Sequence, residues 1–189
     1  MGKKLTVLAC IIFLGLVLTG CEPGVTINFD PERVTVDLGK LDEELPREIK
    51  FQVGFMGMGT LELKRLEFEI ETKDPDDILE EEEELDFLGE ILEDLFTYLE
   101  DETPYRENES YFVRQELDLM VPVLPFFGAE DEADQLPGSI VLQSEAFKEL
   151  EGRLLQEEEL QVNITARFYG EGRVKASSSM LIKIMDSGN

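Results

Sequence analysis

The sequence predicts a mainly β fold with a helical insertion, an antiparallel β-sandwich that carries one long amphipathic helix. Apolar and polar residues alternate in several segments before residue 74 and after residue 110, which is the period of a half-buried strand. Between about residues 74 and 101 the apolar residues recur at steps of three and four, the period of a helix. Sequential strands with one helical interruption favour a single sandwich domain with the helix on one face or end.

Four strands are expected before the helix. They cover Val25 to Phe29, Arg33 to Leu38, Ile49 to Phe55 and Leu61 to Ile70. In the last of them the alternation slips by one residue, which predicts a β-bulge near Lys64 and Arg65. Residues 39–46 and 57–59, rich in glycine or charge, are expected to form a loop and a turn.

The helix is expected from Asp74 to about Asp101. Asp74 is a suitable N-cap and Pro75 fits the first helical position. The apolar ridge consists of Leu85, Leu88, Leu92, Leu95 and Leu99, and Phe87, Ile91 and Tyr98 widen it to nearly half of the circumference. Docking of this stripe on the sandwich is one interpretation. The other is that Phe87, Ile91 and Tyr98 form a helix face that binds a partner or a second copy.

The second half of the chain returns to strands. Residues 102–110 are expected to be a polar loop, followed by a strand from Tyr111 to Val123 in which Pro122 indicates a sheet edge. A short strand at Ile140 to Leu142 and a short helix beginning at Ser144 come next. The last two strands, Leu160 to Phe168 and Val174 to Ile184, alternate on either side of Gly170-Glu171-Gly172, which predicts a hairpin.

Part of the first half resembles bacterial immunoglobulin-like domains of the ASPM/SPD-2/hydin kind. The resemblance rests on Phe29-Asp30-Pro31, Val34 to Gly39, Ile49 to Phe55 and Gly57 to Leu63. The chain has Phe55-Met56 where that family often has Asn before its glycine turn. A late-embryogenesis-like sandwich would give a similar pattern. Either resemblance implies a β-sandwich used for adhesion, scaffolding or binding.

The first 21 residues have the pattern of an export signal. Lys3 and Lys4 precede an apolar run from Leu5 to Leu18, which is shorter than the about 20 residues that cross a bilayer. Leu18-Thr19-Gly20-Cys21 resembles the lipobox of bacterial lipoproteins. The resemblance implies that residues 1–20 are a signal peptide and that a single domain, residues 21–189, is held to a membrane by lipid on Cys21. A plain signal peptide is the alternative.

The net charge of the chain and its lack of His exclude several classes of function. The chain has 43 acidic and 17 basic residues and no His, for a net charge of −26. Removal of residues 1–20 takes away two basic residues and no acidic one, which makes the charge −28. Such an acidic surface disfavours the binding of nucleic acid and repels anionic lipid headgroups. The lipid, rather than the protein surface, would therefore hold the protein at the membrane. If the organism has two membranes, the lipoprotein resemblance implies the outer membrane, because Glu22 rather than an Asp follows Cys21. Without His, catalysis by Ser-His-Asp or Cys-His and His-ligated zinc are excluded.

The acidic runs and one serine run are the other candidates for chemistry. Glu80 to Glu84 is expected to be a solvated helix start, and the loop from Gly128 to Gly138 lacks the spacing of an EF-hand. Cation binding by Glu130, Asp131, Glu132 and Asp134 of that loop is the alternative. Ser177 to Ser179 are expected to be ordinary strand residues rather than nucleophiles activated by a lysine. No catalytic, cofactor-binding or metal-binding residue is assigned.

These observations favour an exported, membrane-anchored lipoprotein that acts as a non-catalytic binding or structural module of the cell envelope. Its expected partners are the membrane, through Cys21, and an envelope protein. A solute- or Ca²⁺-binding lipoprotein is the first alternative. An enzyme that uses carboxylates alone is the second.

Overall fold

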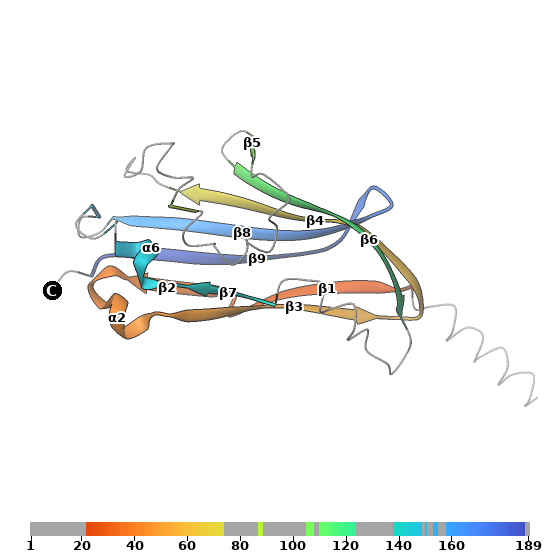
Figure 1. Cartoon of the computed structure of the whole chain (residues 1–189), viewed down its shortest axis with the longest axis horizontal. Helices are drawn as coiled ribbons and strands as arrows, with labels where there is room; N and C mark the ends of the chain where they lie inside the picture. The colour runs from red at the N-terminus through yellow and green to blue at the C-terminus, as the bar shows by residue number, and fades with distance from the viewer. Residues whose placement is uncertain are drawn as a thin grey trace, which may run out of the picture.

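The computed structural model describes residues 22–73, 87–88, 105–107, 110–123, 138–148, 150, 153–154 and 158–187. These residues form two β-sheets stacked as layers (Figure 1). The three-stranded sheet has the order β1 (Gly24–Asp30), β3 (Arg47–Met56), β7 (Ser139–Leu142). The six-stranded sheet has the order β2 (Arg33–Asp37), β9 (Arg173–Met185), β8 (Glu159–Gly170), β4 (Gly59–Lys73), β6 (Ser110–Val123), β5 (Tyr105–Glu107). The expectation of a mainly β, sandwich-like fold is thus confirmed.

Alternating side chains from both sheets make one hydrophobic core. The Phe51 ring on β3 lies 5.7 Å from the Phe68 ring on β4, centroid to centroid, and so joins the two layers. Phe29 on β1 extends this contact, with its ring 5.3 Å from that of Phe51. Because successive side chains of a strand point to opposite faces, the same alternation leaves polar residues on the outer side of each sheet.

The first strand of the sandwich divides between the two sheets. β1 runs antiparallel to β3, and the chain then turns at Pro31 and Glu32. β2 continues in the other sheet, parallel to β9, with Val34 paired to Ile182. The N-terminal segment therefore contributes an edge strand to both layers, which links them covalently at one side.

The predicted bulge in β4 is confirmed. The register against β6 shifts between Leu63 and Arg65. Since the shift moves the alternation by one residue, Leu63 and Leu66 both face the core and are fully buried. Arg65 and Glu67 are consequently directed to the outer side of the six-stranded sheet.

The predicted hairpin is confirmed as β8 and β9, which pair antiparallel with a register shift between Phe168 and Tyr169. Its turn contains Glu171 and Gly172, both with positive φ. The strand expected at Tyr111 to Val123 is β6, and the short strand at Ile140 to Leu142 is β7. The short helix after Ser144 is α6 (Ser144–Lys148).

Two segments that we expected to be loops contain regular structure. Within residues 102–110, β5 pairs with the start of β6, with Arg106 opposite Tyr111. Within residues 39–46, a 3-10 turn η1 (Leu38–Lys40) leads into α2 (Leu41–Glu44). Residues 105–107 are short and polar, so their pairing with β6 rather than a local pattern determines their structure. Between residues 38 and 45, Leu38, Leu41 and Leu45 recur at steps of three and four and are all buried, which is a helical signal only two turns long.

The long helix expected at about 74–101 lies outside the described residues, except for Phe87 and Leu88. Both of these are helical and buried. The Phe87 ring packs edge-on against Phe147 of α6, with centroids 6.2 Å apart. This point of the segment is therefore docked on the sandwich.

Candidate functional site

The outer side of the six-stranded sheet carries a cluster of arginines around one buried carboxylate. Glu67 on β4 is 3% exposed although it points away from the core. Arg114 on β6 donates from Nε to Glu67 Oε2 at 2.6 Å, and the Tyr169 hydroxyl on β8 donates to Oε1 at 2.9 Å. Arg65 and Arg167 add guanidinium nitrogens at 3.7 Å and 3.9 Å. We call these five residues the Glu67 cluster.

Aromatic rings cover the cations of the Glu67 cluster. The Arg65 guanidinium lies 4.1 Å from the centre of the Tyr169 ring, and that of Arg114 lies 4.7 Å from the centre of the Tyr105 ring. Tyr105 in turn stacks on Phe112, with centroids 5.6 Å apart. These rings cover part of the Arg65 and Arg114 guanidinium groups, whose side chains stay 31% and 35% exposed, and the reduced contact with water strengthens their attraction to Glu67.

The chemistry of the Glu67 cluster is structural rather than reactive. Both carboxylate oxygens of Glu67 accept hydrogen bonds, so this group is already engaged as an acceptor. Burial raises the pKa of the Tyr169 phenol, and its hydrogen bond to Glu67 raises that pKa further. The cluster therefore locks β4, β6 and β8 together on the outer face.

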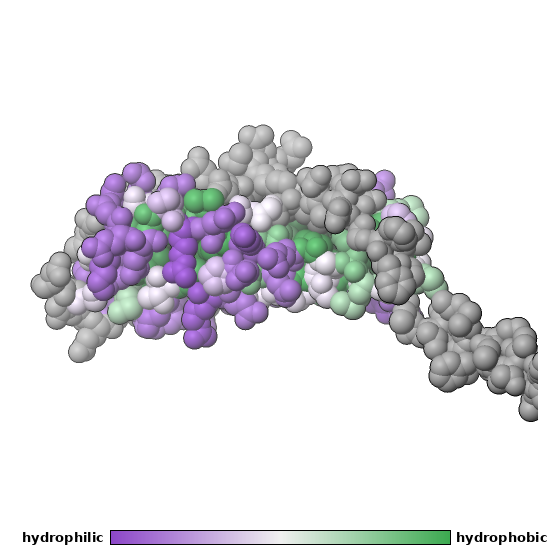
Figure 2. Space-filling model, turned by 90° about the horizontal axis from the view of Figure 1, so that it is seen from below, coloured by the Kyte–Doolittle hydropathy of each residue, from purple (hydrophilic) through white to green (hydrophobic). Residues whose placement is uncertain are grey.

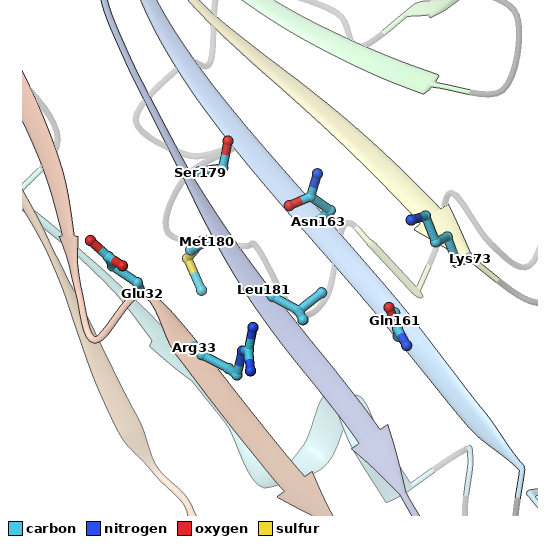
Figure 3. Close-up of a pocket in the computed structure, with 8 residues that line it drawn as sticks. All are labelled: Glu32, Arg33, Lys73, Gln161, Asn163, Ser179, Met180 and Leu181. Atoms are coloured by element: carbon cyan, nitrogen blue, oxygen red, sulfur yellow. The ribbon is translucent and has the colours of Figure 1, made fainter.

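An open groove of about 630 Å³ crosses the same outer face, beyond the Glu67 cluster. We call it the cationic groove. Figure 3 shows the side chains around it, which come from β2, β9, β8 and β4 and from the turn before β2, with the Lys73 ammonium directed toward Asn163 on β8. Its lining consists of Glu32, Arg33, Lys73, Gln161, Asn163, Ser179, Met180 and Leu181. Strand pairing builds this site, since Arg33 lies opposite Leu181 and Lys73 lies opposite Gln161.

The cations of the groove differ from most others in the chain. Lys64, Arg65, Arg114, Arg167, Lys175 and Lys183 all form salt bridges to nearby glutamates. Arg33 and Lys73 form none with any residue that the structure describes. Unpaired cations beside amide and hydroxyl groups can bind an anionic or strongly polar group by charge-assisted hydrogen bonds.

A further feature of interest is the start of the described chain. Glu22 and Pro23 lie against the turn between β3 and β4. A Cβ at Gly57 would be 2.9 Å from the carbonyl carbon of Glu22 and closer still to its oxygen, so only glycine fits there. Pro23 lies 3.5 Å from the corresponding position at Gly59. The chain is thus fixed to the sandwich from its second predicted mature residue onward.

The predicted site residues are only partly placed. Cys21, Ile91 and Tyr98 lie outside the described residues. Phe87, which we considered for a partner-binding helix face, is 7% exposed and packs on Phe147 of the same chain. Its side chain is therefore used inside the domain, as the docking interpretation expects, rather than presented to a partner.

The structure also bears on the acidic residues considered for metal binding and on the serine run considered for catalysis. Within the described ranges, no group of three or more acidic residues is arranged to hold a metal ion. Glu80 to Glu84 and residues 128–137 fall outside those ranges. Ser179 pairs its hydroxyl with Thr165 at 2.9 Å, while Lys175 and Lys183 form ion pairs with Glu171 and Glu159. The serine run therefore consists of strand residues without a lysine base.

In the part of the chain that the structure describes, no helix has the length and apolarity needed to cross a membrane. No model of a known protein family matches the chain. No curated protein matches its sequence at a significant level.

Sequence reasoning missed both the Glu67 cluster and the cationic groove. Alternation does place Arg65, Glu67 and Arg167 on outward positions of their strands. It says nothing of which strands are neighbours or in what register, and those relations bring Arg114 and Tyr169 to Glu67. An arginine at an outward position of three separate strands was the available signal.

Proposed function

We propose that the chain is an exported lipoprotein, anchored by lipid on Cys21, whose sandwich is a non-catalytic binding or structural module of the cell envelope. The lipobox at Leu18 to Cys21 supports export and anchoring. The contact of Glu22 and Pro23 with the β3–β4 turn supports a position of the sandwich close to the anchor. Because no free linker follows Cys21, the anchor would hold the sandwich directly at the membrane surface.

We also propose that the sandwich is immunoglobulin-like. The set β1, β3 and β7 would correspond to the A, B and E strands of that fold, and β4, β8 and β9 to its C, F and G strands. The pairing order within each sheet agrees with this correspondence. The helical segment would then be an insertion between the strands that correspond to C and its neighbour β6.

The cationic groove is the binding surface that we assign to the module. It lies on the outer side of the six-stranded sheet, and its unpaired Arg33 and Lys73 would engage acidic groups of an envelope partner. A Ca²⁺-binding lipoprotein remains the alternative, on the residues of the 128–138 loop. Calorimetric titration with Ca²⁺ separates the two, because a saturable response would favour the alternative.

Metabolic labelling tests the anchor. Cells that produce the wild-type chain should incorporate palmitate into it and retain it in the membrane fraction. Cys21→Ser should lose both the label and the retention, because the thiol that accepts the lipid is gone. Unchanged labelling of Cys21→Ser would refute the proposed anchor.

Reversal of charge tests the groove. The double variant Arg33→Glu/Lys73→Glu should release a partner that co-purifies with the wild-type protein from native membranes. Arg47→Glu/Lys50→Glu is the matched control, since it makes the same charge change on β3 of the other sheet. Equal loss of the partner from both variants would indicate general charge repulsion and would refute the groove as the binding surface.

A further inference from the structure

One end of the sandwich collects the exposed apolar side chains. Among the described residues, the large hydrophobic side chains with substantial exposure are Met56, Met120 and Val174. Met56 ends β3, Met120 lies near the end of β6 and Val174 lies at the start of β9. In Figure 1 these strand ends lie at the end of the molecule away from α2 and α6. We call this the anchor end.

Strand pairing connects the anchor end to the N-terminal segment. Met56 pairs with Gly24, and Met120 pairs with Glu62. A groove of about 430 Å³ is lined by Glu22, Pro23 and Met120 together with Glu62, Glu171, Arg173 and Lys175. Cys21 precedes Glu22 directly, and one residue spans at most about 3.6 Å. Lipid on Cys21 would therefore begin beside these side chains.

Charge differs between the two ends. The anchor end holds Lys64, Arg173 and Lys175, whose charges are balanced by those of Glu62 and Glu171, with which they form ion pairs, and of Glu22. At the other end α2 is acidic, with Asp42, Glu43 and Glu44 in its one turn. Figure 2 shows hydrophilic residues gathered toward the α2 end and paler or apolar residues toward the opposite end. Anionic headgroups would repel the α2 end and tolerate the anchor end.

We propose that the anchor end lies against the lipid bilayer, with Met56 and Met120 in the boundary between headgroups and acyl chains. This inference rests on the proposed lipid anchor. The position of Glu22 selects a bilayer rather than a protein as the occupant, because an acylated Cys21 places lipid at this end. Flexible methionine side chains suit an irregular lipid surface. The cationic groove and α2 are then free to face away from the membrane.

Fluorescence in vesicles tests the inference. The lipidated protein has no free thiol, since Cys10 leaves with the signal peptide and Cys21 carries lipid, so one introduced cysteine can be labelled. Met56→Cys, Met120→Cys and the control Glu43→Cys would carry an environment-sensitive dye in vesicles of phosphatidylethanolamine and phosphatidylglycerol. Dyes at positions 56 and 120 should shift to the blue and be quenched by spin-labelled lipid, whereas the dye at position 43 should do neither. Unfolding temperatures close to wild type verify that the variants fold.

Palmitate content, measured on the same samples, separates the two proposals. Palmitoylated protein without quenching at positions 56 and 120 would overturn the membrane contact and leave the anchor intact. Protein without palmitate would overturn the anchor itself. A blue shift that rises with protein concentration and is insensitive to spin-labelled lipid would show contact with a second copy, and that result also overturns the inference.

Discussion

The main chain of Glu22 lies against Gly57, so that the first residues after Cys21 are part of the sandwich. Gly57 has a φ of +94°, which disfavours every other residue, and its missing side chain leaves room for the Glu22 carbonyl group. This one contact sets the distance between the proposed lipid and the folded domain. Its strength can be measured by substitution.

Gly57→Ala should destabilise the protein more than Gly172→Ala. Both glycines have positive φ, so both alanines are strained by about 1–2 kcal/mol. A Cβ at Gly172 meets open space, whereas one at Gly57 meets Glu22. The difference between the two variants in the free energy of unfolding, measured with urea, isolates the Glu22 contact. Equal destabilisation would mean that the N-terminal segment is not held there.

Glu67→Gln should lower the free energy of unfolding by about 1–3 kcal/mol, because the half-buried Arg114 and Tyr169 groups lose a charged acceptor. Glu69→Gln is the matched control, since Glu69 pairs with Arg167 on the same face but is more exposed. The Tyr169 phenol should also titrate at lower pH in Glu67→Gln, which ultraviolet difference spectroscopy would detect. An unchanged titration would contradict the hydrogen bond between these residues.

Asp37 predicts a specific loss of stability in acid. The hydroxyl of Ser187 donates to its carboxylate at 2.7 Å, the Lys40 ammonium lies 2.9 Å away, and together they hold the pKa of Asp37 well below its usual range. Because the pKa of Asp37 is lower in the folded state, its carboxylate stabilises the fold above the unfolded pKa of about 3.9. This contribution is lost as the pH falls toward the folded pKa.

The difference in stability between wild type and Asp37→Asn should therefore be largest near pH 7 and shrink below about pH 4. Urea unfolding across this pH range measures it. Ser187→Ala should reduce the difference in part, because the Ser187 hydroxyl is the main cause of the pKa shift. A difference that stays constant with pH would contradict the account.

Phe147→Ala should destabilise the fold by about 3–5 kcal/mol, because it removes a fully buried ring. Phe87→Ala should also destabilise the fold. The double variant should lose less free energy of unfolding than the two single variants together, by about 0.5–1.5 kcal/mol for an aromatic pair. Phe87→Ala with unchanged stability but lost self-association, measured by sedimentation, would instead support a partner-binding helix face.

The sequence predicts a strand well where one face of the strand is buried and the other is exposed to solvent. The slip at Lys64 and Arg65 appears in the alternation because a bulge moves all later side chains to the other face. The sequence does not predict β5, because a strand of three residues is too short to show an alternation of apolar and polar residues. Glu67 reaches Arg114 and Tyr169 only through the neighbours and register of β4. The cationic groove depends likewise on the parallel pairing of β2 with β9, which no local pattern indicates.

The most direct measurement is the intact mass of the N-terminal peptide of the chain purified from native membranes. The account predicts that this peptide begins at Cys21 and carries a diacylglycerol group on its sulfur. It also predicts that residues 1–20 are missing. An N-terminal peptide with an unmodified Cys21, or one that retains residues 1–20, would contradict the anchored lipoprotein.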